Sequence, residues 1–270
     1  MSESVEITIL GCGTSTGVPL LQCRCPVCTS RNRKNRRLRA SAWLKTRGKS
    51  FLIDTSSDLR EQALRENIDR VDAILYTHPH SDHVAGIDDV RAFNFLQKMR
   101  IPAYGNAWTH RDLTSRYPYI FTPQGLPEGG GIPEIDFNLI PDGTKSIEVQ
   151  GVKFETLSVK HGSQDVLAYR VENVAYLTDC NHVPEEAAER LHGLEVLILD
   201  CLRLTKHGTH FHLDEALEFI TKIKPRKTIL THLSHDFDYE EWTKRGSDAK
   251  LPRNVTLAYD GMCIRVAGKD

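Results

Sequence analysis

Short apolar runs, rich in β-branched residues, recur along the chain and are separated by polar segments and glycines. Runs of this length and composition are typical of β-strands. They predict strands over residues 5–10, 50–53, 71–76, 152–159, 166–171, 174–177, 196–199, 228–231 and 255–259. The segments between them predict helices over 57–66, 84–98, 184–191 and 213–223. Because groups of strands are interrupted by helices, the pattern predicts an α/β fold with sheets covered by helices.

One stretch, residues 106–143, lacks this regularity. It contains the run Gly129-Gly130-Gly131 and several prolines, namely Pro118, Pro123, Pro127, Pro133 and Pro141. We predict a long loop or small insertion here, and loops of this length often act as lids or binding surfaces. The whole chain, 1–270, is interpreted as a single domain carrying this insertion.

Composition narrows the class of protein. The chain has 270 residues, of which 40% are apolar and 26% charged, and its formal net charge is −1. These values are typical of an ordinary globular protein, and the near-neutral charge provides no overall attraction to nucleic acid or membranes. No apolar run reaches transmembrane length, and the first four residues lack a signal-peptide pattern, so we expect a cytoplasmic protein.

Cations gather in the basic run 31–39, which contains Arg31, Arg33, Lys34, Arg36, Arg37 and Arg39. Such a run is able to attract a phosphate-bearing substrate or RNA. Because no aromatic residues are interleaved with these cations, we favour a solvated, charged surface.

The most informative segment is His78-Pro79-His80-Ser81-Asp82-His83, directly after the predicted strand 71–76. Imidazoles and carboxylates are ligands for Zn, Mn or Fe, and this spacing lets one loop serve two ions. A His-rich surface loop would explain neither the preceding strand nor the donors downstream. His161, Asp179 and His232 each follow a predicted strand and complete a set for two ions.

This order and spacing resemble the metallo-β-lactamase family over nearly the whole chain. The resemblance implies an αββα sandwich, with two mixed β-sheets flanked by helices and two divalent metal ions, Mn or Zn, in the active site. It implies that one ion is held by His78, His80 and His161, the other by Asp82, His83 and His232, with Asp179 shared. Two such cations activate a water and hold an anionic oxygen, so phosphodiesters, thioesters and lactams are all candidate substrates.

Two further segments narrow the substrate. The turn over residues 11–19 starts Gly11-Cys12-Gly13, which would let backbone amides approach an anion, and it resembles the opening of ribonuclease Z and related phosphodiesterases. The second segment is Gly208-Thr209-His210-Phe211-His212, directly before the predicted helix 213–223. The resemblance to the phosphodiesterases implies that a histidine in this segment donates a proton to the leaving oxygen, with His210 as the candidate and His212 as the alternative. The predicted catalytic residues are therefore Asp82 and His210.

Three of the seven cysteines, Cys23, Cys25 and Cys28, crowd into one turn. In a chain without an export signal this indicates a metal site rather than disulfides, and His235 is the candidate fourth ligand of one structural Zn. The alternative is three free, reduced thiols. Together with His232 and His235, the triplet resembles the phosphodiesterase family of the carbon–phosphorus lyase pathway, which opens a phosphoribosyl 1,2-cyclic phosphate. Residues 106–143 depart from that family's pattern.

We therefore predict a dinuclear-metal phosphodiesterase that hydrolyses a small, cyclic phosphate ester, such as a phosphoribosyl cyclic phosphate or a cyclic nucleotide. The first alternative is a ribonuclease Z-like nuclease, which is disfavoured because no segment resembles the long arm that grips tRNA. The second is a non-catalytic, zinc-organised binding protein. Relatives of this kind are commonly dimers, so a homodimer is expected.

Overall fold

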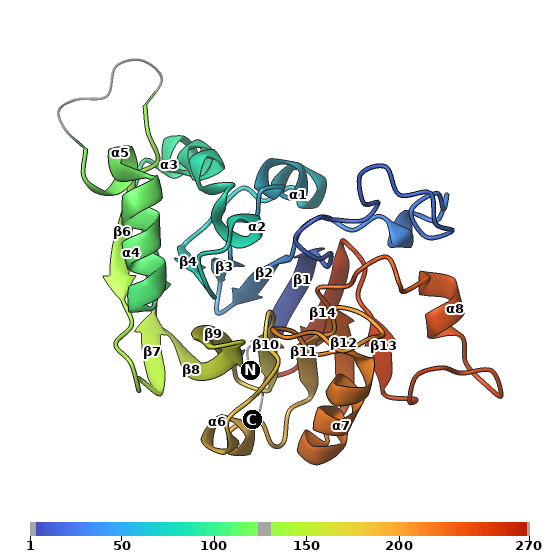
Figure 1. The fold of residues 1–270 in the computed structure, drawn as a ribbon. Coiled ribbons are helices and arrows are strands. Elements are labelled where there is room, and N and C mark those ends of the chain that lie inside the picture. Colours follow the sequence, from blue (N-terminus) through green and yellow to red (C-terminus); the bar gives the residue numbers. More distant parts are fainter. Residues whose placement is uncertain (1–3, 124–130, 269–270) are drawn as a thin grey trace.

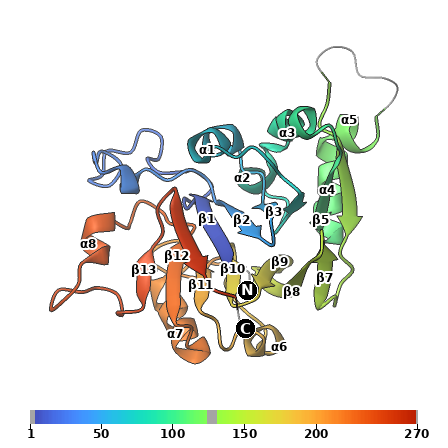
Figure 2. The same cartoon turned by 180° about the vertical axis from the view of Figure 1, so that it is seen from behind.

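The computed structural model describes residues 4–123 and 131–268, and in this part of the chain two β-sheets pack face to face (Figure 1). The strand order is β14-β1-β2-β3-β4-β5-β6 in the first sheet and β13-β12-β11-β10-β9-β8-β7 in the second. Helices cover the outer faces of both sheets, as Figure 2 shows from behind. This confirms the predicted αββα sandwich of two mixed sheets.

The first sheet is antiparallel from β14 to β3 and parallel from β3 to β6. Its strands are β1 (Val5–Gly11), β2 (Ser41–Thr46), β3 (Lys49–Ile53), β4 (Ala73–Leu75), β5 (Ile101–Gly105), β6 (Ile135–Leu139) and β14 (Met262–Val266).

The second sheet is antiparallel from β7 to β10 and parallel from β10 to β13. Its strands are β7 (Ser146–Val149), β8 (Val152–His161), β9 (Gln164–Val171), β10 (Val174–Leu177), β11 (Val196–Asp200), β12 (Lys227–Thr231) and β13 (Val255–Leu257). In both sheets the parallel strands end at the same edge. The segments after β4, β10 and β12 carry predicted metal ligands, and His161 is the last residue of the antiparallel strand β8.

The helices are short. They are α1 (Leu59–Glu66), α2 (Ser81–Val84), α3 (Val90–Gln97), α4 (Ala107–Arg116), α5 (Pro118–Phe121), α6 (Glu185–Glu189), α7 (Leu213–Ile223) and α8 (Tyr239–Thr243), with 3₁₀ helices η1 (Arg33–Asn35) and η2 (Ile87–Asp89). On α7 the predicted apolar face is buried against the second sheet through Leu213, Ala216 and Ile220.

Three apolar layers hold the sandwich together. Between the sheets, Phe51 of β3 meets Phe154 of β8 edge to face, with ring centroids 5.0 Å apart. The other two layers lie between each sheet and its helices. Burying an aromatic or large aliphatic side chain contributes about 1.5–3 kcal/mol, so these layers fix the relative placement of the two sheets and thereby of their loops.

The structure corrects the expectation for residues 106–143. Within the described residues this stretch contains α4, α5 and β6 rather than one irregular loop. Asn106 caps α4 by accepting a hydrogen bond from the backbone N–H of Thr109, and Pro118 occupies the first position of α5. Pro127, Gly129 and Gly130 lie outside the described residues. The prolines therefore mark helix starts and strand ends as well as loops.

The predicted helix 84–98 is also wrong in detail, because it is divided into α2, η2 and α3. The break lies at Gly86, where an added Cβ would come within 2.0 Å of the Ser56 carbonyl oxygen. Strands β2, β5, β6, β7 and β14 were not predicted, since they are short and several alternate buried with exposed residues. No helix in the described part of the chain is long and apolar enough to span a bilayer.

Candidate metal centre

The segment 78–83 forms the loop between β4 and α2 and continues into the first turn of α2. Its backbone is fixed by Asp54, which follows β3 and accepts hydrogen bonds from the N–H and hydroxyl of Thr77 at 2.8 Å each. The loop thus leaves the sheet edge in a defined direction and presents its side chains toward the second sheet.

A first group of three imidazoles converges at this edge. The ligand atoms of His78, His80 and His161 lie within 4.8 Å of one another. His78 and His161 are buried, whereas His80 is exposed. His161 comes from the end of β8, and its Nδ1 lies 2.8 Å from the carbonyl oxygen of Thr209, which fixes the ring and leaves Nε2 for the group.

A second group combines Asp82, His83, Asp179 and His232, again within 4.8 Å. The Oδ1 of Asp179 lies 3.2 Å from His83 Nε2, and its Oδ2 lies 3.3 Å from His232 Nε2. The same Oδ2 is 3.7 Å from His78 Nε2, an atom of the first group. Asp179 therefore lies between the two groups, where a shared ligand is expected.

The donor atoms of the second group fit a divalent cation. Asp82 Oδ2, His83 Nε2 and His232 Nε2 are buried and have no hydrogen-bond partner among the described residues. Buried polar atoms are nearly always hydrogen-bonded, so an unsatisfied cluster of this kind calls for another partner. Imidazole nitrogens and carboxylate oxygens together are the ligand types of Zn, Mn and Fe sites.

The electrostatics of the cluster also favour a cation. Burial lowers the pKa of His78 well below its ordinary value, and the neighbouring His83 adds to this effect. For His83, burial is outweighed by the carboxylates of Asp179, Asp82 and Asp54, which raise its pKa well above the ordinary value. Three carboxylates around one imidazole form a site with excess negative charge, which a divalent cation would neutralise.

Backbone strain accumulates at the same place. Asp54, Asp179 and His232 have φ values of 64°, 53° and 58°, in the left-handed region. This conformation costs a non-glycine residue about 1–2 kcal/mol, and such residues cluster at functional sites. Asp54 and His232 directly follow a strand and Asp179 lies two residues beyond one, where the backbone turns to aim each side chain inward.

Two carboxylates that support the cluster were not predicted from the sequence. Asp54 lies 2.8 Å from His83 Nδ1, and Asp200 lies 2.9 Å from His210 Nδ1 while accepting a hydrogen bond from the Cys180 N–H. Asp54 directly follows the buried strand β3, and Asp200 is the last residue of the buried strand β11, so both lie at strand ends as several predicted ligands do. Their location at the ends of apolar strands was the sequence signal that could have identified these two carboxylates.

His210 lies beside the second group. Its ring stacks on that of His232 with centroids 4.7 Å apart, and its Nε2 is 3.9 Å from Asp179 Oδ2. Burial acts to lower the pKa of His210, but the Asp200 carboxylate outweighs it and raises the pKa to about 9. His212, the alternative, lies at the start of α7 with its Nδ1 2.7 Å from Glu215 Oε2, and none of the candidate metal groups includes it.

The cysteine triplet meets His235 as predicted. The ligand atoms of Cys23, Cys25, Cys28 and His235 lie within 4.8 Å, with His235 Nδ1 at 3.5 Å and 3.3 Å from the first two sulfurs. Burial raises the pKa of Cys25, but hydrogen bonds with His235 and with the Cys28 N–H outweigh it and bring the pKa to about 6. A thiolate at neutral pH in a set of four S and N donors suits zinc.

Two sequence expectations near this loop hold only in part. In the basic run, Arg31, Arg33 and Arg36 are exposed, as expected. Arg37 is buried, and it donates hydrogen bonds to the carbonyl oxygens of Ser234 and Phe237 at 2.7 and 2.5 Å. It therefore ties the basic run to the loop after β12 instead of lying on a solvated surface. In the turn 11–19, the amides of Cys12 and Gly13 already donate to Asp260 and Leu38, and Gly13 is required because a Cβ would lie 2.7 Å from the Arg37 carbonyl oxygen.

Comparison with known proteins agrees with the fold and the cluster. Residues 49–233 match the family described as "Beta-lactamase superfamily domain". A crystal structure of a diphosphatase from the PhnP family matches with a TM-score of 0.89 and 40% identity, covering 98% of both chains. Human tRNase Z, short form, matches with a TM-score of 0.66 and 17% identity over 96% of this chain and 98% of its own, a likeness of fold alone.

A sequence relative is the octanoyltransferase of Porphyromonas gingivalis, 34% identical over 258 residues. The match covers 94% of this chain but 50% of that protein, so the chain spans half of its length. The family match, together with the convergent imidazoles and carboxylates, shows that the chain belongs to the beta-lactamase superfamily of metallo-hydrolases.

Proposed function

We propose that this protein is a metal-dependent phosphodiesterase. Its substrate is a small molecule in which a phosphate is linked through two of its oxygens to other groups. The observation that supports this most strongly is the convergence of seven donor residues into two adjoining groups joined by Asp179. One ion would be held by His78, His80 and His161, the other by Asp82, His83 and His232. When bound, two ions would activate a water and neutralise charge on the phosphate.

The remaining residues orient the imidazoles and supply a proton to the leaving oxygen. Asp54 orients His83 through Nδ1, so that Nε2 faces Asp82 and Asp179. Asp200 does the same for His210. With its pKa raised to about 9, His210 carries a proton at neutral pH and is placed to donate it from Nε2 to the leaving oxygen. Protonation by a positioned imidazole typically contributes about 10²–10⁴-fold to the rate.

Two substrate classes fit one such centre. A cyclic phosphate diester is supported by the Cys–His set and the ligand pattern. A diphosphate linkage is supported by the 40% identical relative, whose name identifies it as a diphosphatase. In both, a nucleophile attacks a phosphorus that carries a leaving oxygen, and the bond from phosphorus to that oxygen breaks, so the same ligands and the same acid serve either.

The two alternatives from the sequence are weaker. A tRNA nuclease is supported only by a likeness of fold, and the basic run provides fewer free cations than expected because Arg37 is buried and Arg39 pairs with Asp58 at 3.0 Å. A purely binding role leaves the protonated His210, oriented by Asp200, without a purpose.

The test is a substrate panel with the full chain loaded with Mn or with Zn. We expect turnover of bis(p-nitrophenyl)phosphate and of cyclic phosphates or diphosphates, and little cleavage of pre-tRNA. Hydrolysis absent with both metals, in protein whose metal content has been measured, would overturn the proposal. Preferential cleavage of pre-tRNA trailers would favour the nuclease.

We also propose a structural zinc held by Cys23, Cys25, Cys28 and His235. It would fasten the loop after β1 to the loop after β12, which carries His232. Three thiolates and one imidazole form a closed tetrahedral set that leaves no position for a substrate.

A further inference from the structure

A cavity of about 530 Å³ lies next to Trp108, whose indole contacts His80 of the first group of imidazoles, and we name it the Trp108 cavity. It is bounded by α4, by the connection from β6 to β7, by β8 and β9, and by the start of α6; its wall includes Trp108, Arg111, Ser158, Gln164, Asp165 and Arg190. Its volume is in the range that holds small-molecule ligands.

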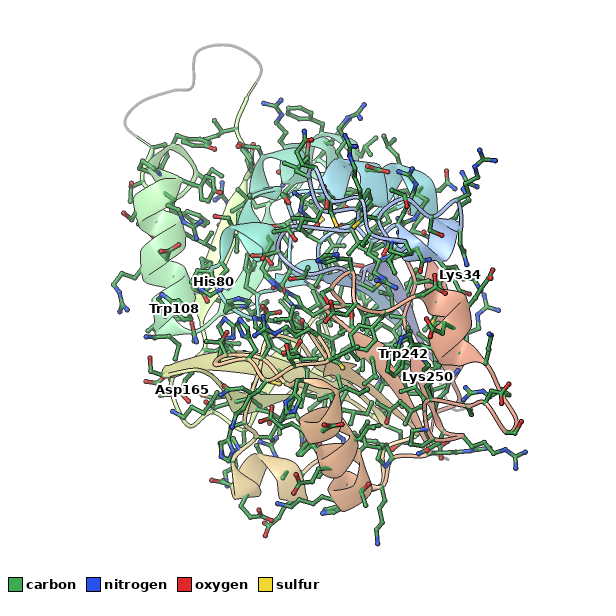
Figure 3. All side chains as sticks on the ribbon, turned by 45° about the vertical axis from the view of Figure 1, so that its right-hand side comes forward. Lys34, His80, Trp108, Asp165, Trp242 and Lys250 are labelled. Atoms are coloured by element: carbon green, nitrogen blue, oxygen red, sulfur yellow. The ribbon has the colours of Figure 1, made fainter. Side chains whose placement is uncertain are left out.

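Trp108 connects this cavity with the metal centre, because it lines the cavity and its ring contacts an imidazole of the first group. Its indole is half-buried and lies edge to face with the exposed His80, with ring centroids 5.6 Å apart and planes at 90°. Figure 3 shows His80 and Trp108 together at the lower end of α4, with Asp165, another lining residue of the cavity, below them. A substrate whose phosphate is held at the imidazoles would therefore bring its adjoining group against the indole.

The charges of the cavity favour a neutral group there. Its lining contains three cations, Arg111, Lys145 and Arg190, and three carboxylates, Asp142, Asp165 and Glu186, so they cancel. Lys145 pairs with Glu186 at 2.7 Å, and Asp165 accepts from Lys160 at 2.8 Å. A second phosphate would find no surplus of positive charge, whereas a polar, uncharged ring would find both donors and acceptors.

We propose that the Trp108 cavity binds a nucleobase, so that the substrate of the proposed phosphodiesterase is a nucleotide whose base stacks on Trp108. Arg111, one turn further along α4, has no ion-pair partner within the described part of the chain and is able to donate to acceptor atoms on the base edge. This inference rests on the proposed function, because the metal centre places the phosphate.

The test compares AMP with ribose 5-phosphate, which differ in the base, by calorimetric titration of the metal-loaded full chain. Stacking of one base on an aromatic side chain contributes about 1–3 kcal/mol, which corresponds to about 5- to 150-fold in affinity. We expect AMP to bind at least about fivefold more tightly than ribose 5-phosphate. In Trp108→Ala the ratio of the two affinities should fall toward one, and in Arg111→Ala it should also decrease.

Trp108 also packs against the apolar layer beneath the second sheet, so Trp108→Ala could destabilise the fold. A second measurement therefore uses a more conservative variant. AMP should quench the tryptophan fluorescence of the native chain, and Trp108→Phe should lose this quenching while keeping a preference for AMP. Trp242→Phe, which removes an indole packed on Phe237, is the matched control and should keep both.

Equal affinity for AMP and ribose 5-phosphate in the native chain would overturn the inference, as would an unchanged ratio in folded Trp108→Ala. These outcomes leave the proposed function intact if bis(p-nitrophenyl)phosphate is still hydrolysed. Binding of AMP without hydrolysis of any phosphodiester would instead reject the function and retain the base site.

Discussion

At the scale of single residues, Asp179 connects the two candidate ligand groups. Its two oxygens face nitrogens of His83, His232 and His78 at 3.2–3.7 Å. Its position two residues beyond β10 and its left-handed backbone aim the carboxylate between the groups. Charge and geometry at this one position therefore decide whether both ions are held together.

Replacing Asp179 by Asn should remove one metal ion and lower kcat/KM by more than the 10–100-fold typical of outer-shell partners. Asn is preferred to Ala because Asn tolerates the left-handed conformation, so the change tests charge rather than backbone strain. Elemental analysis and kinetics measure the two effects. Asp136→Asn, an exposed carboxylate on β6, should keep full activity. Retained metal and turnover in Asp179→Asn would exclude a bridging role.

A different result is expected for His210, because we propose that it donates a proton to the leaving oxygen. His210→Gln should lower kcat by about 10²–10⁴-fold for substrates with an alkoxide leaving group, because such oxygens need a proton. Bis(p-nitrophenyl)phosphate should be affected much less, because its leaving group is stable as an anion. Metal content should stay unchanged. A variant that loses metal, or loses both activities equally, would show that His210 is a ligand instead.

At the scale of elements, loops far apart in sequence are fastened together behind the metal centre. Cys23 and Cys25 meet His235, while Arg37 donates to the carbonyls of Ser234 and Phe237. The loop after β12 is thus held from two sides immediately beyond His232. Backbone hydrogen bonds add to these contacts, because the N–H groups of Leu233 and Ser234 donate to the carbonyl oxygens of Cys12 and Leu202.

Cys25→Ser should lower the zinc content by one ion per chain and reduce Tm, because a closed zinc site contributes folding free energy directly. Elemental analysis and thermal unfolding provide the two measurements. The exposed Cys263→Ser is the matched control and should change neither. Zinc content equal to that of the native chain would reject the structural site.

Asp260, in the loop between β13 and β14, is expected to make the stability of the protein depend on pH. Asp260 has a side chain only 11% exposed, and it accepts hydrogen bonds from the Cys12 and Leu38 amides. Burial raises its pKa to about 6, above the unfolded value near 3.8. The folded state therefore binds the proton more tightly, and this contribution to the free energy of unfolding is lost as pH rises from about 4 to 6.

Asp260→Asn removes this dependence. The free energy of unfolding of the variant, relative to that of the native chain, should increase by about 2 kcal/mol between pH 4 and pH 7. Denaturant titrations in the presence of a chelator measure it without interference from bound metal. A constant or decreasing difference would contradict the raised pKa.

At the scale of the whole molecule, the candidate centre joins the two sheets. His78, His80, Asp82 and His83 come from the first sheet's edge, whereas His161, Asp179 and His232 come from the second. The corresponding segments follow β4 on the first sheet and β8, β10 and β12 on the second, so the centre lies at one edge of the sandwich. Metal binding at this place would therefore hold the halves of the chain together.

Removal of the metals should accordingly lower Tm of the full chain and should be reversed by added Mn or Zn. A ligand present at 1,000 times its Kd stabilises by about 4 kcal/mol, which is a large share of ordinary domain stability. Thermal unfolding with and without chelator measures the shift. An unchanged Tm in protein shown to contain no metal would argue against coupling between the sheets.

The sequence alone determined the ligand types, their spacing and the class of fold. The segment from His78 to His83 is local, and the strands before His161, Asp179 and His232 have apolar patterns that are visible without a structure. The spacing of Cys23, Cys25 and Cys28 was likewise sufficient to predict a metal site. These features depend on neighbours in sequence, which is why residue patterns suffice to predict them.

Only the tertiary structure decided how distant residues meet. The contacts of Asp54 with His83, of Asp200 with His210, of Arg37 with Ser234 and of Trp108 with His80 join different elements. Arg37 and Ser234, which are 197 positions apart, become neighbours through the packing of the two sheets, which no local periodicity encodes. Burial of Arg37 and the division of the 84–98 helix at Gly86 follow from that packing for the same reason.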